Sequence, residues 1–389
     1  MKAPSLTPET LADLTALRHA LHAAPDLSGE ERATAARLRA FLAPGAPDRI
    51  VEGLGGTGLA VVYDSGRPGP RVLFRAELDA LPIQEQTGLP YASRHSGKAH
   101  LCGHDGHMTI LAGLGLHFAQ HRPSCGQVIL LFQPAEETGA GARAVLADPR
   151  FAELSPDWAF ALHIMPGLPH GAVAVAAGAA SCATCGLRIR LRGRETHAAH
   201  PEAGRSSAPA VAAILAGLTP YGTPPPMGPD FTLATPCHLM MGEAAFGIAP
   251  ATAEIWITLR AYDDPGLARF EAAIRAQITE AAQGLTLEIT RHDHFNASIN
   301  DPSAAEHALQ ARDALGLAPG DMALPMRAGE DFGAFSTNTR AALIFVGAGE
   351  AHPALHRPDF DFPDTLLAPG IALFAQIADQ ISAEIGRSG

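Results

Sequence analysis

The sequence predicts an α/β fold with a mostly parallel-sheet catalytic domain and an inserted, smaller α+β unit of ferredoxin-like pattern. Three observations lead to this prediction. In the first half of the chain, apolar runs of strand length alternate with helix-length segments, as in βαβ units with a parallel sheet. From about residue 182 the order becomes strand-helix-strand-strand-helix-strand, which is the ferredoxin-like motif. After about residue 296 the first pattern returns.

The first half begins with an amphipathic helix pattern in which leucines recur near helical spacing. Further helices are expected over Met108–Gln120 and Gly141–Ala147. The expected strands between the helices are short apolar runs bounded by turn residues. They are Leu59–Tyr63, Arg71–Arg75, Val128–Phe132 and Trp158–His163.

The inserted unit is expected to be built from half-exposed strands, because apolar and polar residues alternate along them. Its strands are Gly186–Arg194, Cys237–Met241, Ala253–Arg260 and Leu285–Arg291, and its helices are Pro209–Leu218 and Pro265–Gln283. A helix at Pro302–Leu315 and a buried strand at Ala341–Val346 then resume the first pattern. The predicted domains are therefore residues 1–181 with 297–389, and residues 182–296.

Composition excludes several classes of protein. Hydrophobic residues make up 47% and charged residues 17%, which is ordinary for a globular chain. The formal net charge of -12 argues against nucleic acid or an anionic membrane as a partner. No apolar run approaches the ~18 residues of a membrane span, and no signal peptide is visible. With five cysteines and no secretion signal, a cytoplasmic protein with reduced thiols is expected.

Metal-ligand residue types collect at four places, three of which directly follow expected strands. In an open α/β sheet, side chains delivered at the carboxyl ends of strands converge on one pocket. The four places are Glu77 with Asp79, the segment His100–His107, the pair Glu136–Glu137, and His163.

The segment His100–His107 gives the most specific signal. It holds three histidines, one cysteine and one aspartate, and imidazole with thiolate suits zinc or another late first-row divalent metal. Gly103 would let Cys102 and His104 approach one centre from a tight turn. The alternative, a surface turn capped by Asp105, is weaker because cysteine among histidines is rare by accident.

The other candidates are ambiguous alone. The Glu136–Glu137 pair is either a solvated helix start or a metal ligand beside a general base. His163 could equally be a core histidine, and either His352 or His356 could complete a metal site. Glu330–Asp331 is either close to the site or exposed. Cys182 and Cys185 form a Cys-x-x-Cys without a second pair, so we interpret them as small buried side chains.

Taken together, these segments resemble the amidohydrolases of the aminoacylase, hippurate hydrolase and auxin-conjugate hydrolase group, relatives of the co-catalytic zinc carboxypeptidases. The resemblance covers essentially the whole chain. It rests on His-x-Cys-Gly-His-Asp-Gly-His at 100–107, Phe-Gln-Pro-Ala-Glu-Glu at 132–137, Gly-Glu-Asp-Phe at 329–332 and His-Arg-Pro-Asp-Phe-Asp-Phe at 356–362.

The resemblance implies two divalent metal ions per subunit, manganese or zinc, with cobalt or nickel also compatible. It assigns Glu136 as general base, with Cys102 placed to bridge the metals. The implied metal ligands are Cys102, His104, Glu137, His163 and His356, and Asp79, Glu77 and Glu330 would orient them.

By the same resemblance, the inserted unit is a lid and dimerisation domain, so a homodimer or higher homo-oligomer is expected. His197 would stabilise the oxyanion, reaching the active site of a partner subunit, and Arg260 would bind the substrate carboxylate. The implied substrate is a small N-acyl amino acid.

The sequence departs from the family pattern at two informative positions. Glu77 stands where relatives usually have Asp, so a carboxylate remains. Gly247 stands where relatives have an Asn that helps hold the substrate, which leaves the substrate's identity open. Two alternative functions remain: a dipeptidase or carboxypeptidase with the same two-metal site, and a catalytically silent metal- or ligand-binding protein.

Overall fold

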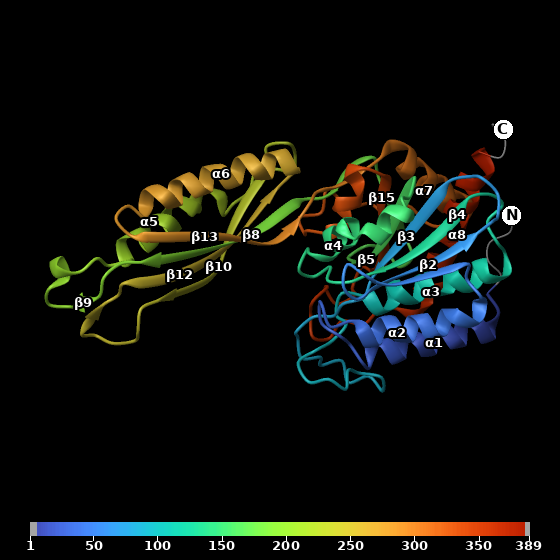
Figure 1. Ribbon diagram of the computed structural model, residues 1–389, viewed down its shortest axis with the longest axis horizontal. Coiled ribbons are helices and arrows are strands. Elements are labelled where there is room, and N and C mark those ends of the chain that lie inside the picture. Colours follow the sequence, from blue (N-terminus) through green and yellow to red (C-terminus); the bar gives the residue numbers. More distant parts are fainter. Residues whose placement is uncertain (1–5, 386–389) are drawn as a thin grey trace. The chain divides into compact units, whose positions relative to one another are not determined.

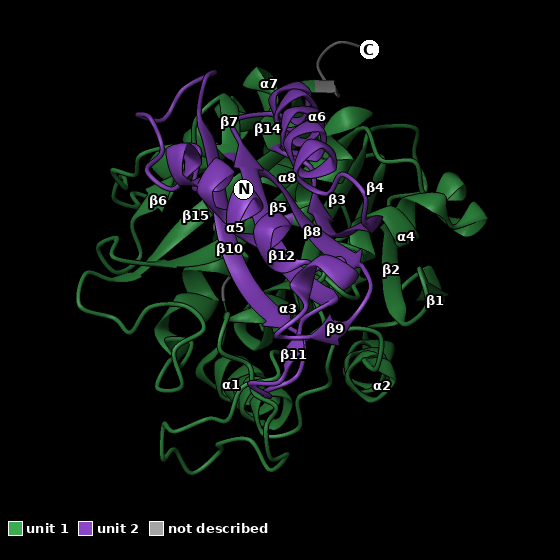
Figure 2. Cartoon of the chain, turned by 90° about the vertical axis from the view of Figure 1, so that its left-hand side faces the viewer, with its two compact units in different colours: residues 1–180, 298–324, 331–389 green, residues 181–297, 325–330 purple. Residues whose placement is uncertain are grey.

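The computed structural model describes residues 6–385. The ends of the first and last predicted domain segments, residues 1–5 and 386–389, lie outside the described residues. The chain divides into two compact units (Figure 2). Unit 1 comprises residues 1–180, 298–324 and 331–389, and unit 2 comprises residues 181–297 and 325–330.

Unit 1 is built on a seven-stranded sheet with the order β1-β2-β4-β3-β5-β15-β6 (Figure 1). The central strands β4, β3, β5 and β15 run parallel to one another, whereas β1, β2 and β6 pair antiparallel at the two sides. Antiparallel strands at the edges of a parallel sheet are common in α/β folds. The strands are β1 Arg49–Leu54, β2 Gly58–Asp64, β3 Arg71–Glu77, β4 Gln127–Gln133, β5 Trp158–Pro166, β6 Val173–Ala174 and β15 Arg340–Gly349. The predicted α/β fold class is confirmed.

Helices pack on this sheet, and the helix at the centre of the packing, α3, begins at the candidate metal segment. α3 contacts α1, α2 and α8, and most of its residues are buried. The helices of unit 1 are α1 Pro8–His22, α2 Arg32–Leu42, α3 His104–Gln120, α4 Gly141–Ala147, α7 Pro302–Ala314 and α8 Leu367–Ile385.

Among the described residues, one helix region, Asp364–Glu384, is long and apolar enough to cross a membrane by length and composition. It contains most of α8, and 61% of its most apolar window is buried inside the structure. Leu367, Ile371 and Phe374 lie in the same core cluster as the central strands. We therefore assign α8 as a core helix of unit 1.

Unit 2 contains a four-stranded antiparallel sheet with the order β10-β12-β8-β13. Its elements, in chain order, are β8 Ala183–Arg192, α5 Ala208–Leu218, β10 Thr232–Met241, β12 Thr252–Ala261, α6 Asp264–Ala281 and β13 Thr286–Phe295. Both helices pack their apolar sides on the sheet (Figure 1). Strand β10 begins earlier than expected and accommodates Pro236 at a bulge, which is possible because β10 is an edge strand.

Candidate metal centre and active site

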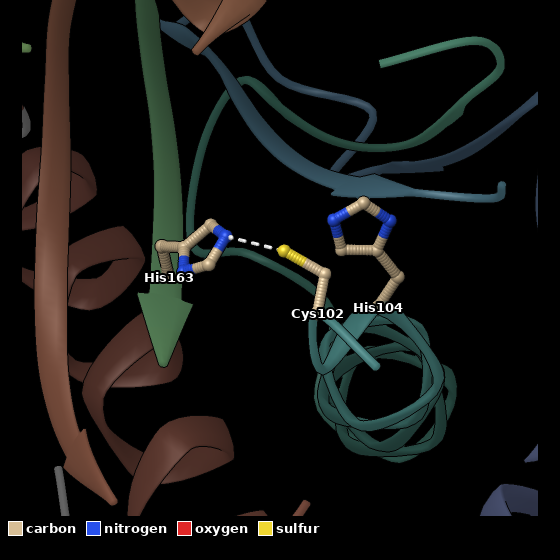
Figure 3. Close-up of side chains that lie close together, drawn as sticks. All are labelled: Cys102, His104 and His163. Carbon is tan, nitrogen blue, oxygen red and sulfur yellow. Dashed lines mark hydrogen bonds between the residues drawn. The ribbon is translucent and has the colours of Figure 1, made fainter. Parts of the chain in front are cut away.

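The metal-ligand residues predicted in the first half of the chain come together in unit 1. Cys102 and His104 lie at the start of α3, and His163 lies on β5 (Figure 3). Glu136 and Glu137 directly follow β4, where Pro134 ends the strand. The carboxyl ends of the parallel strands β4 and β5 thus deliver Glu136, Glu137 and His163, and the start of α3 brings Cys102 and His104 to the same place.

One group of potential ligands consists of Cys102, His104 and His163. Their ligand atoms all lie within 4.8 Å of one another, and the three residues are buried. The Cys102 thiol is 3.6 Å from Nε2 of His163. Figure 3 shows this thiol between the two imidazole rings.

A second group consists of Cys102, Glu137 and His356, again with ligand atoms within 4.8 Å of one another. Nε2 of His356 is 3.3 Å from the Cys102 thiol and 3.8 Å from Oε2 of Glu137. His352 instead directs Nδ1 at the Pro353 carbonyl, so the structure favours His356 over His352 as the histidine of this loop. Cys102 belongs to both groups.

The histidines of the first group are prepared to bind a cation. His104 donates from Nδ1 to the Asp79 carbonyl at 2.8 Å, and His163 donates from Nδ1 to the Ile164 carbonyl at 2.7 Å. In its neutral form each imidazole therefore presents the lone pair of Nε2, the tautomer that metal-binding histidines need. Nε2 of His104 is buried and has no hydrogen-bond partner among the described residues. A buried polar atom without a partner is costly unless something binds it.

The electrostatic field of the site also fits a cation. Burial lowers the pKa of His163 to about 3, so this imidazole is neutral and able to bind metal. For His104, burial opposes protonation, but the nearby carboxylates Glu77, Glu137 and Asp79 outweigh it and raise the pKa. The same negative field attracts a divalent ion. Thiolate, imidazole and carboxylate together suit late first-row metals.

Glu136 lies at the edge of the two groups and is only 6% exposed. Its Oε2 is 3.9 Å from Nε2 of His104, as is Oε1 of Glu137. The residue before it, Ala135, adopts a φ of 51°, a left-handed conformation that is uncommon outside glycine and is often found at functional sites. This turn lets two adjacent glutamates approach one histidine.

The residues expected to orient the ligands do so by different routes. Asp79 accepts hydrogen bonds from the Glu137 backbone N–H at 3.0 Å and from Ser28 at 2.7 Å. Glu77 bonds to Nδ1 of His107 at 2.7 Å, and Nε2 of His107 accepts from the Ile164 backbone N–H at 3.1 Å. Glu77 therefore fixes the ring of His107, and His107 in turn binds the backbone of β5 at the residue next to His163.

The remaining predicted residues lie in unit 2. Glu330 is 1% exposed, so the alternative that it is a surface residue is wrong. His197, on β9 (Thr196–His197), is exposed and accepts the Ala199 N–H at Nδ1, which leaves its Nε2 as a donor. Arg260, on β12, donates to the Thr184 hydroxyl and the Arg327 carbonyl, and no carboxylate in residues 6–385 pairs with it.

Sequence reasoning missed two buried ionic clusters beside the site. Arg18 and His22 on α1 converge on Asp105, and Arg75 pairs with Glu77 and Asp331. Arg18, His22, Arg75 and Asp105 are each at most 1% exposed. Charged side chains are rarely buried without partners. A charged residue on an amphipathic helix is therefore predicted to be exposed unless its partners, which are distant in the sequence, are known. Only the fold brings these residues together.

Gly103 should be among the least replaceable residues of unit 1. Its φ is +87°, and a Cβ there would lie 2.5 Å from a methyl group of Ile164. We expect Gly103→Ala to lower the free energy of unfolding by about 2–4 kcal/mol, from backbone strain plus overpacking. Gly97→Ala is the matched control, because φ is +73° and nothing lies within 4 Å. Equal losses in thermal or urea unfolding would contradict the steric argument.

His22 should make stability depend on pH. Burial alone would lower its pKa, but hydrogen bonds and charges from Asp105 and Glu85 raise the pKa from 6.5 to about 10. Because the folded-state pKa is raised, the stabilisation is complete below about pH 6.5 and is lost as pH rises through 10. We expect metal-free His22→Gln to be less stable than wild type by about 3 kcal/mol at pH 6, with the gap shrinking toward pH 10. A constant gap in urea unfolding across this range would contradict the shifted pKa.

Comparison with known proteins places this arrangement in a family. The model of peptidase family M20/M25/M40 matches residues 73–380. The N-acetyldiaminopimelate deacetylase of Bacillus subtilis is 31% identical, covering 89% of this chain and 92% of its own length. The enzyme of the same name from Bacillus velezensis is 30% identical, covering 94% and 99%. The chain belongs to peptidase family M20/M25/M40.

Solved structures agree with this assignment. The YXEP protein of Bacillus subtilis, a dinuclear metal-binding peptidase of the M20 family, superposes with a TM-score of 0.79 at 26% identity, covering 95% of this chain and 98% of its own. An aminobenzoyl-glutamate utilization protein from Klebsiella pneumoniae shares the fold, with a TM-score of 0.73 at 20% identity over 95% and 96%. The chain is thus a metallopeptidase-like hydrolase of amide bonds.

Proposed function

We propose that this protein hydrolyses the amide bond of N-acyl amino acids in a reaction that requires two divalent metal ions. The observation that carries the proposal is the sharing of Cys102 by two groups of ligands, one fully buried and one that includes the exposed His356, with the buried carboxylate of Glu136 beside them. A pair of metals with an adjacent base is the arrangement that hydrolyses amides.

In this proposal Cys102, His104 and His163 would hold one metal, and Cys102, Glu137 and His356 would hold the other. Cys102 belongs to both groups, so its thiolate would be available to both metals. Manganese and zinc are the expected ions, with cobalt and nickel compatible, because affinity order alone does not select the metal in a cell. Bound there, the metals would lower the pKa of a water molecule and polarise the amide carbonyl.

The chain's own groups complete the reaction. Glu136 takes the proton of the attacking water and then passes it to the departing amine, so one carboxylate serves as base and acid in turn. His197 donates a hydrogen bond from Nε2 to the oxyanion in the active site of a partner subunit, and stabilisation of this kind is usually the largest single contribution to such catalysis. Arg260 is a half-buried cation that donates to two neutral oxygens, and in this proposal it receives the substrate carboxylate.

In this proposal the inserted domain, predicted as residues 182–296, acts as a lid and dimerisation domain. The protein is then a homodimer or higher homo-oligomer. The two curated relatives described above, both named N-acetyldiaminopimelate deacetylase, support the substrate class. N-acetyldiaminopimelate is itself an N-acyl amino acid, so it belongs first in the substrate panel. The five cysteines are free thiols, which supports the cytoplasm as the location.

The test is release of free amino acid from a panel of N-acyl amino acids that includes N-acetyldiaminopimelate and benzoyl glycine. The enzyme is stripped with a chelator and then reloaded with manganese or zinc. We expect at least a 100-fold loss of turnover on stripping and its return only with metal. The preferred acyl group then names the substrate.

Two outcomes would overturn the proposal. Turnover of dipeptides but of no acyl amino acid would make the protein a dipeptidase, and the N-terminal ammonium of a dipeptide would then need an acidic partner in the site. Failure of both substrate classes with either metal, in protein shown to contain two metal equivalents, would make it a metal-binding protein without this activity.

A further inference from the structure

The loop that carries His356 is strained at that residue and is held in place by contacts with other parts of the chain. His356 has a φ of 64°, a left-handed conformation that is strained for a residue other than glycine. Its side chain is 49% exposed, so burial alone does not fix it. Such a conformation persists only where surrounding contacts over-determine it. The contacts that hold this loop therefore decide whether His356 faces Cys102.

Two of those contacts join the loop to the segment around the start of α3. The backbone N–H of His356 donates to the Leu101 carbonyl at 2.8 Å. The ring of Phe362 lies against Gly106, where a Cβ would come within 2.2 Å of it. Neither of these two contacts involves a charged side chain of the loop.

The third contact is ionic and comes from α1. Nη1 of Arg18 donates to Asp105 at 3.0 Å and to Asp361 at 2.8 Å, and Nε donates to Asp364. Tyr91 donates to the other oxygen of Asp361 at 2.7 Å. Arg18 is fully buried, while the Asp361 and Asp364 side chains are 25% and 33% exposed.

The carboxylates that Arg18 binds lie on segments that also carry the proposed metal ligands. Asp105 directly follows His104, and Asp361 lies on the loop of His356. One guanidinium thus joins a ligand segment of the first group to a ligand segment of the second. His22, Asp105 and Asp361 are close enough to hold a metal ion themselves, but Arg18 pairs with both carboxylates there.

We propose that Arg18 is a positioning residue for the metal centre: it holds the His356 loop on the start of α3 and so sets the affinity of the metal bound by Cys102, Glu137 and His356. The inference rests on the proposed function. Without the guanidinium, the three carboxylates Asp105, Asp361 and Asp364 would keep the imidazoles of His22 and His19 as partners but would lose the one cation that contacts all three. Their mutual repulsion in this largely buried place would then increase. The part of the loop around the exposed His356 would then move away from the start of α3, and the backbone strain at His356 would relax.

The test measures metal affinity and does not depend on turnover. Metal-free wild type, Arg18→Met and Arg18→Lys are titrated with Co²⁺, and the visible and thiolate charge-transfer absorption report each equivalent bound. We expect Arg18→Met to weaken one of the two equivalents by 10- to 100-fold, the range found for residues that support metal ligands, and to leave the other within about threefold. Arg18→Lys keeps the positive charge but loses the planar, multiply donating guanidinium. Its metal affinity should therefore lie between those of wild type and Arg18→Met. Arg39→Met is the control, because Arg39 pairs with Glu52 on an exposed surface.

Wild-type affinity for both equivalents in folded Arg18→Met would overturn the proposal. Should Arg18→Met fail to fold by circular dichroism, Asp361→Asn decides, because it removes a partly exposed partner and keeps Arg18 bound to Asp105. Asp361→Asn should then weaken the same equivalent, and an unchanged affinity would overturn the proposal. His356→Ala separates the two hypotheses. If it leaves both equivalents intact, the ligand set of the proposed function is wrong, and if it alone loses one, only the role of Arg18 is wrong.

Discussion

Glu136→Gln should lower kcat by about 10²- to 10⁴-fold, the contribution typical of a general base, without loss of bound metal. The amide of glutamine has nearly the shape of the carboxylate but cannot accept the proton of the attacking water. The residue is 6% exposed, so water does not easily replace it. The measurement is kcat on the preferred acyl amino acid, with metal content determined on the same sample.

The neighbouring residue provides the matched control. Glu137→Gln removes a proposed ligand 3.8 Å from His356, so this variant should lose metal affinity before it loses rate at saturating metal. A wild-type rate in Glu136→Gln would remove Glu136 from the role of base. Loss of a metal equivalent in Glu136→Gln would instead make it a ligand, a role that its grouping with His104 and Glu137 allows.

Much of the fold follows from local patterns in the sequence. The strands expected at Arg71–Arg75, Val128–Phe132 and Trp158–His163 are all present, each slightly longer than its apolar run. In β3 and β4 the reason is that polar residues at the strand ends, such as Gln133, continue the backbone ladder after the hydrophobic signal has stopped. Strand β5 instead continues through apolar Ile164 and Met165 beyond His163. Strand β1 was not predicted, because Arg49–Leu54 lies at the edge of the sheet and is only partly buried.

The candidate site was partly predictable for a different reason. Cys102, His104 and Glu137 stand out because their residue types are uncommon together and directly follow strands or open a helix. The choice between His352 and His356 could not be made from composition, since both lie in one loop and only the left-handed backbone at His356 turns its imidazole to the thiol.

The buried network of Arg18, His22 and Asp105 shows where pattern reasoning ends. Arg18 and His22 are charged or polar residues on an amphipathic helix, where such residues are usually solvated. Their burial depends on Asp105 and Asp361, which lie far away in the sequence. No local spacing encodes such a pairing.

Cys102→Ala should remove both metal equivalents, whereas His163→Ala and His356→Ala should each remove one. The thiol is 3.6 Å from Nε2 of His163 and 3.3 Å from Nε2 of His356, so it is the atom shared by both groups of ligands. Loss of a shared thiolate removes one ligand from each metal and the negative charge that offsets their repulsion. We expect at least a 10³-fold loss of kcat/KM at micromolar metal, because activation of the water depends on bound metal.

Metal stoichiometry after gel filtration is the measurement for this series. Cys237→Ala is the control, since Cys237 is an exposed free thiol on β10 and should bind no metal. If Cys102→Ala retained one tight equivalent, the thiolate would belong to a single metal and the water would have to be the only bridge. If His163→Ala and Cys102→Ala instead lost the same single equivalent, and His356→Ala the other, the two metals would be held independently. Only the loss of both equivalents from Cys102→Ala, together with one from each histidine variant, fits a centre built around a shared sulfur.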